Sequence, residues 1–580
     1  MVTDLVLGMA GSGGDGVVSA GESLLAAASS EGYHAMMTKS FGSQIRGGES
    51  SCRVRVSCRR ILNPGGVLDV AVALNWEDFF RFGAELPLGS STLVIHEEKA
   101  GPPPKLLSSK LVFSVPITEM AKKAAGTDKA KTSVVLGLIS GWLGIPREAL
   151  LRGLKKKFGG KGAGLFEANE RALASGFEYA QTQPLVEPRV LSRPPAAAGP
   201  KLLCDGNDMC AAGAIFSGVE FFGGYPITPS TEVMQILSRE LLQHGGVVLQ
   251  AEDEISGIGA ALGASYAGRK SMTATSGPGM SLKTEILGLA SIAELPLVVL
   301  NVQRGGPSTG IPTKPEQADL FQAAFSAHGD VVRPVLAPTT VADTFSATVE
   351  AFNLAERYQT PVIILSDQEI AQRKETVDAI DTSRFTLERR LVPTSGELDD
   401  YQRFRLTESG ISPLSHPGMP GGNYLGAGIE HNEHGDPTAS GAMHQRMNEK
   451  RFKKLEPLKH RRDFFEVLGR ADARYALVSW GSVAGVTREA FELAVARGLD
   501  VKLLVPTLVY PVAEQVYQEF FASVRAGLVV ELSYQGQLYR ILRMFVDVPK
   551  GVVPFTRSGA NPFQPTEVLE RLAELATAEN

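Results

Sequence analysis

The stretch FFGGYPITPSTE, residues 221–232, decides the fold that the sequence predicts. Apolar residues run into two glycines, two prolines then restrict the backbone, and Ser230 or Thr231 stands where a helix N-cap belongs. This order predicts a strand, a turn and a helix, with Tyr225 and Thr228 just beyond the carboxyl end of the strand. Open α/β sheets bind their ligands at that end. A capped turn without a ligand would explain the same residues if the stretch stood alone.

Similar patterns extend outward from this stretch and predict a multidomain α/β protein. The first part of the chain alternates strands and helices, which predicts a parallel sheet covered by helices. Apolar runs near residues 250, 273, 299 and 363 are each followed by a helical pattern, and the C-terminal part returns to the same alternation. The predicted parts are an α/β domain at 1–181, a proline-rich linker at 182–200, a second α/β domain at 201–390, an irregular covering segment at 391–460 and a third α/β domain at 461–580.

Charge and composition exclude several classes of protein. The 580 residues carry 58 basic and 63 acidic side chains, and they lack the basic run that nucleic-acid binding requires. The longest apolar stretches, such as 295–302, are far shorter than the about 20 residues that span a bilayer. We therefore expect no nucleic-acid partner and no membrane, and a cytoplasmic location because no export signal follows Met1.

The cysteines and histidines do not form a metal-binding pattern. Cys52 and Cys58 are separated by five residues, as are Cys204 and Cys210, whereas iron–sulfur clusters are usually held by closely spaced thiolates. The two histidines of EHNEHGD, residues 430–436, lie three apart, but in a segment full of turn formers. We expect no metal on this chain, and any cluster on another chain.

A helix of small residues begins with a carboxylate in LQAEDEISGIGAALGASYAG, residues 249–268. Glu254 opens this helix, where partial burial would suit it to exchange a proton with a heterocyclic nitrogen. Carboxylates at a helix N-terminus are also ordinary complements of the helix dipole, and this alternative stays open for Glu252, Asp253 and Glu254.

Two further strand ends carry candidate ligand-binding residues. TSGPGMSLKTE, residues 275–285, places Ser276 and Gly277 in a turn suited to a ligand ring. Within 297–320, Arg304 follows an apolar strand, and its guanidinium could pair with a substrate carboxylate. A surface salt bridge is the alternative for Arg304 considered alone.

The N-terminal segment GMAGSGGDGVV, residues 8–18, is a glycine-rich turn between a strand and a helix. Gly13 and Gly14 could let backbone N–H groups approach a phosphate. A dinucleotide site would also need an acidic residue at the end of the second strand, where Lys39 stands instead. A tight turn, another phosphate-bearing ligand or a partner contact remain as explanations.

A companion segment, SFGSQIRGGESSCRVRVS at residues 40–57, places Arg46 beside Gly47 and ahead of an alternating strand. The Arg46 guanidinium could clamp an anionic group with two hydrogen bonds. It could equally hold a loop through main-chain carbonyls.

In this order, the segments resemble the 2-oxoacid:ferredoxin oxidoreductases, and the resemblance covers essentially the whole chain. YPITPST, TSGPGMSL and VQRGGPSTGIPT are specific to the alpha part of that family. GSGGDGVV with RGGESS resembles its gamma part, and SWGS with VVELSYQGQL resembles the last domain of the alpha part. The chain thus looks like a gamma–alpha fusion, with a gamma-type domain, a pyrimidine-binding domain and a transketolase C-terminal-like domain.

The resemblance implies thiamine diphosphate bound between this chain and a separate beta subunit that carries Mg²⁺ and a 4Fe-4S cluster. It implies that Glu254 contacts the aminopyrimidine ring and that Thr228 and Arg304 contact the 2-oxoacid carboxylate. These three are the expected catalytic residues. The other expected cofactor contacts are Tyr225, Pro226, Ile227, Ser276 and Gly277.

The resemblance also implies partners. Electrons would pass to ferredoxin, coenzyme A would be the co-substrate, and the assembly would be an (alpha-beta)₂ heterotetramer. Coenzyme A or a subunit interface would then explain the glycine-rich turn and its companion, Gly13, Gly14, Arg46 and Gly47.

The expected reaction is conversion of 2-oxoglutarate to succinyl-CoA and CO₂, in either direction, because fused two-chain members often resemble 2-oxoglutarate enzymes. Pyruvate or broad specificity stays open, since Arg304 and Thr228 would bind the carboxylate common to all 2-oxoacids. Two alternatives are a non-redox thiamine-dependent transferase or decarboxylase and a nucleotide-binding scaffold. The first should carry its own magnesium motif, and the second leaves Glu254 without a role.

Overall fold

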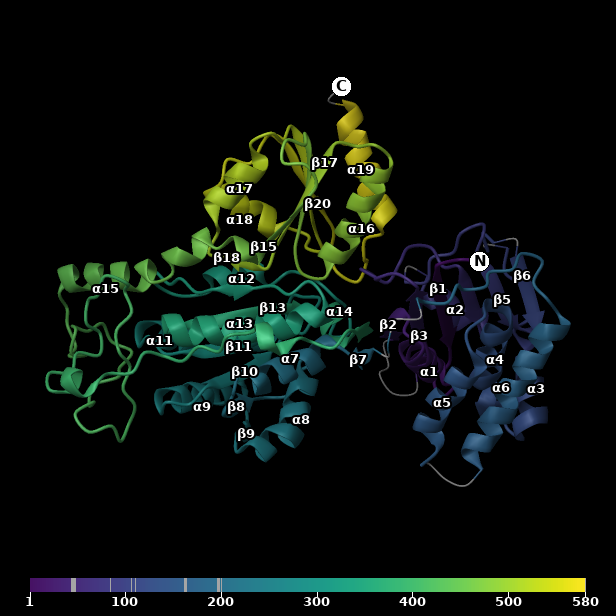
Figure 1. The fold of residues 1–580 in the computed structure, drawn as a ribbon, viewed down its shortest axis with the longest axis horizontal. Helices are drawn as coiled ribbons and strands as arrows, with labels where there is room; N and C mark the ends of the chain where they lie inside the picture. The colour runs from purple at the N-terminus through teal and green to yellow at the C-terminus, as the bar shows by residue number, and fades with distance from the viewer. Residues whose placement is uncertain are drawn as a thin grey trace. The chain divides into compact units, whose positions relative to one another are not determined.

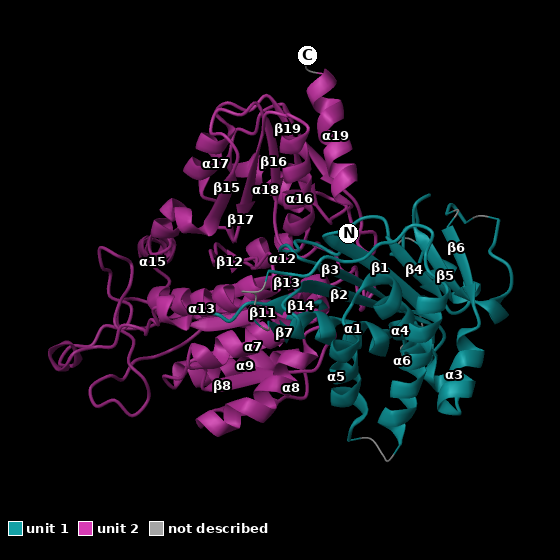
Figure 2. Ribbon diagram, turned by 45° about the vertical axis from the view of Figure 1, so that its right-hand side comes forward, with its two compact units in different colours: residues 1–205, 373–380 teal, residues 206–372, 381–580 magenta. Residues whose placement is uncertain are grey.

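The computed structural model describes residues 1–42, 48–83, 85–105, 107–109, 111–160, 164–195, 199 and 201–578. Its contacts divide the chain into two compact units, coloured separately in Figure 2. Unit 1 comprises Met1–Asp205 and Arg373–Ile380, and unit 2 comprises Gly206–Gln372 and Asp381–Asn580. The five-part division of the sequence stays a prediction. Among the described residues no helix is long and apolar enough to cross a bilayer.

Unit 1 is a sheet with helices on both faces, in the strand order β6-β5-β4-β1-β3-β2-β14-β7 (Figure 1). Leu5, Leu7 and Met9 of the first strand lie in one apolar cluster with the first, fourth and fifth helices, and Val6 and Ala10 lie in a second cluster with α2. The elements are β1 (Asp4–Gly11), α1 (Val17–Ser30), β2 (His34–Phe41), β3 (Ser50–Ser57), β4 (Val70–Ala73), α2 (Trp76–Arg81), β5 (Leu93–Glu97), β6 (Leu111–Val115), α3 (Ile117–Ala125), α4 (Lys131–Leu143), α5 (Arg147–Phe158), α6 (Leu165–Thr182), β7 (Leu202–Cys204) and β14 (Lys374–Val377).

The expectation of a parallel sheet in this part is correct for only half of its strands. β1, β4, β5 and β6 are parallel, but β3 pairs antiparallel with both β1 and β2. Only residues 42–49 separate β2 from β3. A parallel crossover needs a dozen or more residues, so such a short connection favours an antiparallel pair.

Unit 2 contains two sheets. The first has the order β18-β12-β13-β11-β10-β8-β9, and the second has the order β15-β17-β16-β19-β20. Figure 1 shows the second sheet between α17 and α18 on one side and α16 and α19 on the other. Residues 206–372 contain α7 (Gly206–Phe216), β8 (Phe221–Gly224), α8 (Thr231–Glu240), β9 (Val247–Gln250), α9 (Glu254–Tyr266), β10 (Ser271–Thr275), α10 (Gly277–Leu282), α11 (Thr284–Ile292), β11 (Leu297–Gln303), α12 (Leu320–Phe325), β12 (Val335–Leu336), α13 (Val341–Tyr358), β13 (Pro361–Asp367) and α14 (Gln368–Gln372). Residues 441–578 contain α15 (Gly441–Lys453), β15 (Phe465–Leu468), β16 (Tyr475–Ser479), α16 (Val483–Ala496), β17 (Val501–Pro506), β18 (Leu508–Tyr510), α17 (Glu514–Phe521), β19 (Ala526–Glu531), α18 (Gln537–Phe545), β20 (Gly551–Thr556) and α19 (Pro565–Ala578).

The central strands of unit 2 are buried on both faces. Val298, Leu300 and Val302 of β11 lie in a cluster with α7, α8 and α13, whereas Leu297 and Val299 lie in a cluster with α9, α11 and α12. Parallel strands covered on both faces are expected to read as continuous apolar runs, as β11 does. The predicted multidomain α/β fold is confirmed.

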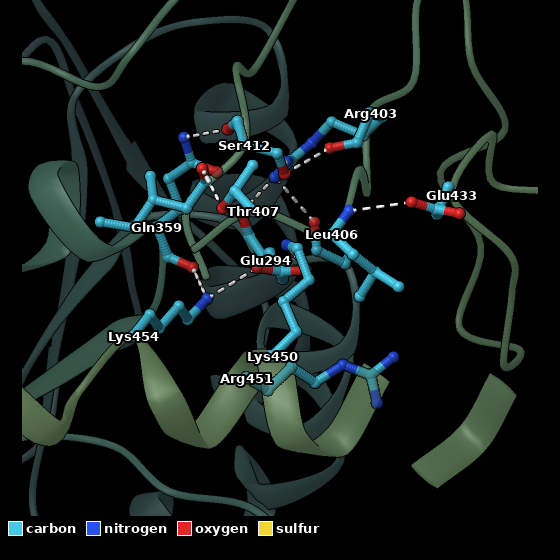
Figure 3. Close-up of polar contacts among 12 residues, drawn as sticks. Glu294, Gln359, Arg403, Leu406, Thr407, Ser412, Glu433, Lys450, Arg451 and Lys454 are labelled. Atoms are coloured by element: carbon cyan, nitrogen blue, oxygen red, sulfur yellow. Dashed lines mark hydrogen bonds and ion pairs between the residues drawn. The ribbon is translucent and has the colours of Figure 1, made fainter. Parts of the chain in front are cut away.

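A buried ion cluster anchors the irregular segment 391–460 to the rest of unit 2 (Figure 3). Glu294, which is fully buried after α11, receives Lys450 Nζ at 2.6 Å and Lys454 Nζ at 3.0 Å on its two carboxylate oxygens. Arg403 donates to the Glu294 carbonyl oxygen at 2.7 Å. Burial alone would raise the pKa of the Glu294 carboxyl, but the three cations together hold that pKa far below its usual value.

Candidate active site

Glycines at the end of β8 let helix α9 lie directly against this strand. A Cβ atom at Gly223 would lie 2.5 Å from the Gly257 carbonyl oxygen, and one at Gly257 would lie 3.0 Å from the Gly224 Cα atom. Any larger residue would therefore push the helix away from the sheet. This close packing brings the start of α9 to the carboxyl end of the strands.

Glu254 is the first residue of α9, and its side chain is buried, 8% exposed. Asp253 forms the N-cap and accepts a hydrogen bond from Ser256 N at 2.7 Å, so the capping role falls to Asp253. A Cβ atom at Gly279 would lie 2.7 Å from Glu254 Cγ, which shows how closely α10 packs on this side chain. No described residue donates a hydrogen bond to the Glu254 carboxylate, which leaves it available to a ligand.

Ser276 follows β10 directly and is the N-cap of α10, whose first residue is Gly277. The Ser276 hydroxyl is fully buried and has no hydrogen-bond partner among the described residues. A Cβ atom at Gly277 would lie 2.8 Å from Asp319 Oδ2, so only glycine fits there without displacing that carboxylate. A buried unpaired hydroxyl calls for an explanation, and a bound group would supply the missing partner.

Arg304 follows β11 and meets the turn that contains Thr228. Its Nη1 donates to the Thr228 carbonyl oxygen at 2.6 Å and its Nη2 to the Thr309 carbonyl oxygen at 3.0 Å. The Nε atom is buried and unpaired among the described residues, and burial lowers the pKa of the guanidinium. The structure thus brings two predicted residues together, but through the main chain of Thr228, whose side chain is exposed.

A cavity of about 590 Å³ opens beside Arg304. One wall comes from the turns after β10 and β11, and the other comes from the C-terminal part of unit 2. Hydroxyl and amide side chains line it together with one arginine and two carboxylates. Its polar side chains are Ser281, Arg304, Ser308, Glu316, Asp319, Gln322, Ser533, Tyr534, Gln535, Gln537 and Ser558.

Gln317 fixes the loop beside this cavity. Its backbone N–H donates to the Leu532 carbonyl oxygen at 2.7 Å, and its side-chain oxygen accepts from Leu532 N at 2.8 Å. Gln537 adds a bond to the Ala318 carbonyl oxygen at 2.7 Å. The C-terminal part of unit 2 therefore holds in place the segment that carries Asp319.

Asp319 is a titratable group of the cavity that our sequence reasoning missed. Burial raises the pKa of its carboxyl to about 6, against the opposing hydrogen bond from Asn301 Nδ2 at 3.2 Å. Glu316 adds to the rise, and Arg304 opposes it. Perturbed acids in a cavity are common at functional sites. The sequence around it, PTKPEQADL at residues 312–320, contains two acidic residues, Glu316 and Asp319, and does not distinguish Asp319 from the other.

Replacing Asp319 with asparagine is expected to stabilise the chain above about pH 6. The folded chain holds this proton to about pH 6, whereas an unfolded carboxyl releases it near pH 4, so wild-type stability falls as pH rises between these values. The Asp319→Asn variant lacks this loss, and its advantage should grow to at most about 3 kcal/mol. Denaturant unfolding across pH 4–8 checks this, and a difference independent of pH would contradict it.

The remaining predicted residues lie in the turn after β8 and in the N-terminal part of the chain. Tyr225 is 39% exposed, and Pro226 and Ile227 are partly buried beside it. In unit 1, Gly14 has a φ of 92° in the turn after β1, where Gly13 also lies. Arg46 and Gly47 lie outside the described residues.

The histidine segment has a structural explanation. His431 is buried, its ring centroid lies 3.8 Å from that of Phe404, and its Nδ1 lies 3.0 Å from the Ile429 carbonyl oxygen. The described part of the chain contains no group of three or more histidine, cysteine or acidic residues placed to hold a metal ion.

Comparisons with known proteins identify the family of the chain. Residues 212–450 match the family described as pyruvate flavodoxin/ferredoxin oxidoreductase, thiamine diP-bdg, and residues 6–179 match pyruvate ferredoxin/flavodoxin oxidoreductase. A solved 2-oxoglutarate:ferredoxin oxidoreductase from Magnetococcus marinus, with 2-oxoglutarate, coenzyme A and succinyl-CoA bound, is 37% identical, has a TM-score of 0.94 and covers 99% of this chain and 100% of its own.

Curated relatives point to the same family. The 2-oxoglutarate oxidoreductase subunit KorA of Mycobacterium tuberculosis is 35% identical over 86% of this chain and 81% of its own length. The 2-oxoglutarate synthase subunit KorA of Methanothermobacter marburgensis is 36% identical over 63% of this chain and 97% of its own length, so part of this chain has no counterpart in that subunit. The chain belongs to the 2-oxoacid:ferredoxin oxidoreductase family, as a fused alpha subunit.

Proposed function

We propose that this chain is the alpha subunit of a 2-oxoglutarate:ferredoxin oxidoreductase, which converts 2-oxoglutarate and coenzyme A to succinyl-CoA and CO₂ and passes the released electrons to ferredoxin. The observation that carries the proposal is the buried Glu254 carboxylate, which no described residue engages by a hydrogen bond. The substrate rests on the two KorA relatives and on the Magnetococcus marinus structure, in which 2-oxoglutarate is bound. No disulfide links the four cysteines, all of which lie in the described part of the chain, which supports the cytoplasm as the compartment.

The residues around Glu254 fit thiamine diphosphate. When bound, this cofactor supplies the carbon nucleophile that attacks the keto carbon of a 2-oxoacid. Glu254 would hold a proton at the pyrimidine nitrogen, and the unpaired Ser276 hydroxyl and the Gly277 backbone would lie against the ring. Tyr225, Pro226 and Ile227 would provide a further contact at the end of β8.

Arg304 would bind and orient the substrate carboxylate. Two of its nitrogens are fixed by main-chain carbonyls, and the residue lies on the wall of the cavity that a 2-oxoacid would fill. Held by neutral carbonyls, the guanidinium keeps its full charge for an anionic ligand. Thr228 would add its exposed hydroxyl at the same place.

A beta subunit would complete the site. Several large apolar side chains near the start of α9 and along the edge strand β9 are exposed, which is expected of a surface that a partner covers. We propose that the beta subunit carries Mg²⁺ and the 4Fe-4S cluster. Ferredoxin would accept the electrons, and the assembly would be an (alpha-beta)₂ heterotetramer. The exposed side chains are Tyr225, Val247, Leu249, Ile255 and Leu282.

The glycine-rich turn of unit 1 remains a candidate contact for coenzyme A or for a subunit. Asp15 accepts a hydrogen bond from Ser12 N at 3.0 Å and pairs with Lys131 at 2.7 Å. These bonds fix the conformation of the turn and leave Gly13 and Gly14 exposed. The exposed backbone suits a partner or the phosphates of coenzyme A.

The test is anaerobic co-purification of this chain with its beta subunit, followed by 2-oxoglutarate- and coenzyme-A-dependent reduction of a viologen dye. Activity should need both chains and should exceed the activity with pyruvate. Preference for pyruvate would correct the substrate alone. Absence of activity with every 2-oxoacid, in a complex that holds thiamine diphosphate and the cluster, would overturn the proposal.

Replacing Arg304 with alanine should lower kcat/KM for 2-oxoglutarate and for pyruvate by a similar factor, about tenfold to a hundredfold, because a charged hydrogen bond to a shared carboxylate is lost. Steady-state kinetics with both substrates checks this. Arg239→Ala is the matched control, since Arg239 is 70% exposed on α8. A loss restricted to one substrate would contradict a role at the common carboxylate.

A further inference from the structure

Lys283 is a fully buried lysine that lies beneath Glu254. It joins α10 to α11, and its ammonium donates to the Glu254 carbonyl oxygen at 2.8 Å and to the Thr273 hydroxyl at 3.4 Å. Both acceptors are neutral. No described carboxylate forms an ion pair with Lys283, so its charge is not matched by direct contact.

Burying an ammonium without a paired carboxylate is unfavourable. Burial lowers the pKa of Lys283 to about 8, while the nearby carboxylates of Glu254 and Asp253 oppose this shift. The ammonium and the Glu254 carboxylate therefore attract one another across the first turn of α9. Elsewhere in unit 2, Lys450 and Lys454 avoid this situation by pairing directly with Glu294.

Two constraints act on Glu254 from different directions. Gly279 leaves no room for even one more carbon atom beside Glu254 Cγ, so α10 limits the side chain from one side. Lys283 holds the main chain of the same residue and attracts its charge. A carboxylate that must meet a ring nitrogen has to be placed within a few tenths of an ångström, and packing with supporting hydrogen bonds achieves this.

We propose that Lys283 is a positioning residue, which holds Glu254 and its negative charge in place for the aminopyrimidine ring of thiamine diphosphate. This inference rests on the proposed function. It assigns to Lys283 no contact with substrate or cofactor. Lys283 would act through its hydrogen bond to the carbonyl oxygen of Glu254 and through its attraction to the carboxylate of Glu254.

The test compares Lys283→Met with Lys502→Met in the complex with the beta subunit. Lys502 is a matched control because it is buried and donates to a carbonyl oxygen, that of Ala471 at 2.7 Å, and to a hydroxyl, that of Ser523 at 2.9 Å. Lys502 lies in the C-terminal sheet, on β17. Both variants lose one ammonium and the same two kinds of hydrogen bond, so both lose stability.

We expect Lys283→Met to lower kcat by about tenfold or more, with the KM for 2-oxoglutarate within about twofold of wild type, since Arg304 is untouched. Calorimetric titration of the cofactor-depleted complex with thiamine diphosphate should show weaker binding. The near-ultraviolet circular dichroism of the bound aminopyrimidine should change. Lys502→Met should retain wild-type kcat, affinity and spectrum.

Failure of this inference and failure of the proposed function give different results. If wild type turns over 2-oxoacids but Lys283→Met matches Lys502→Met in kcat, cofactor affinity and spectrum, the positioning role is wrong. If no 2-oxoacid is turned over, the function is wrong, and the affinity and spectrum still decide the role of Lys283. In the Glu254→Gln background, Lys283→Met should weaken cofactor binding no further, and an additive loss would overturn the proposal.

Discussion

Replacing Glu254 with glutamine should lower turnover by about two to four orders of magnitude, while folding and assembly with the beta subunit remain intact. The amide keeps the size of the side chain and fits the same space beside Gly279, so packing is preserved. It cannot exchange a proton with a ring nitrogen. Steady-state rates of dye reduction measure the turnover. The elution volume of the complex shows whether the variant still folds and assembles with the beta subunit.

Glu252→Gln is the matched control for this variant. Glu252 stands two residues earlier in the same turn and is exposed, so its carboxylate is solvated and its replacement should leave turnover unchanged. Unchanged turnover in Glu254→Gln would discard the assignment of Glu254. Equal losses in both variants would indicate that the charge of the whole turn matters, and not the position of one carboxylate.

Sequence patterns predicted much of the secondary structure, because those strands and helices have a local cause. Helix α1 (Val17–Ser30) follows the glycine-rich turn and strand β10 (Ser271–Thr275) lies near residue 273, as the sequence predicts. Each is followed within two residues by a glycine, which marks the turn after it. The antiparallel pairing of β3 was missed because pairing partners depend on the tertiary fold. Helix α15 was also not predicted, because most of its residues are polar and only Met447 and Lys450 are buried.

The candidate site shows the same limit. Glu254 and Arg304 were identified because they follow strands and stand among glycines, which is visible locally. Lys283 and Asp319 were not identified, because burial gives them their chemical character, and burial depends on elements that pack from elsewhere in the chain. Asp319, for example, lies beside Gly277, 42 residues away in sequence, only after the loop is fixed by Gln317.

Replacing Glu294 with glutamine should destabilise unit 2 by about 3–5 kcal/mol, because it leaves buried cations without their counter-charge. Lys450 and Lys454 are both almost fully buried, and both pair with this one carboxylate. Arg403 lies beside it as well, on the irregular segment. The denaturant midpoint of the transition should fall, and protease should cleave within 391–460 sooner than in wild type.

The expected loss of stability depends on the burial of the Glu294 carboxylate, and not on the removal of a negative charge alone. Glu574→Gln is the control, since the Glu574 carboxylate pairs with Arg571 on the surface of α19 and both side chains are exposed, so its midpoint should match wild type. Adding Lys450→Met and Lys454→Met to Glu294→Gln removes the unpaired ammonium groups and should recover part of the lost stability. If the triple variant is no more stable than Glu294→Gln, uncompensated charge is not the cause. The cluster would then act through its hydrogen bonds to the Glu294 and Gln359 carbonyl oxygens, which fix the irregular segment without any need for charge.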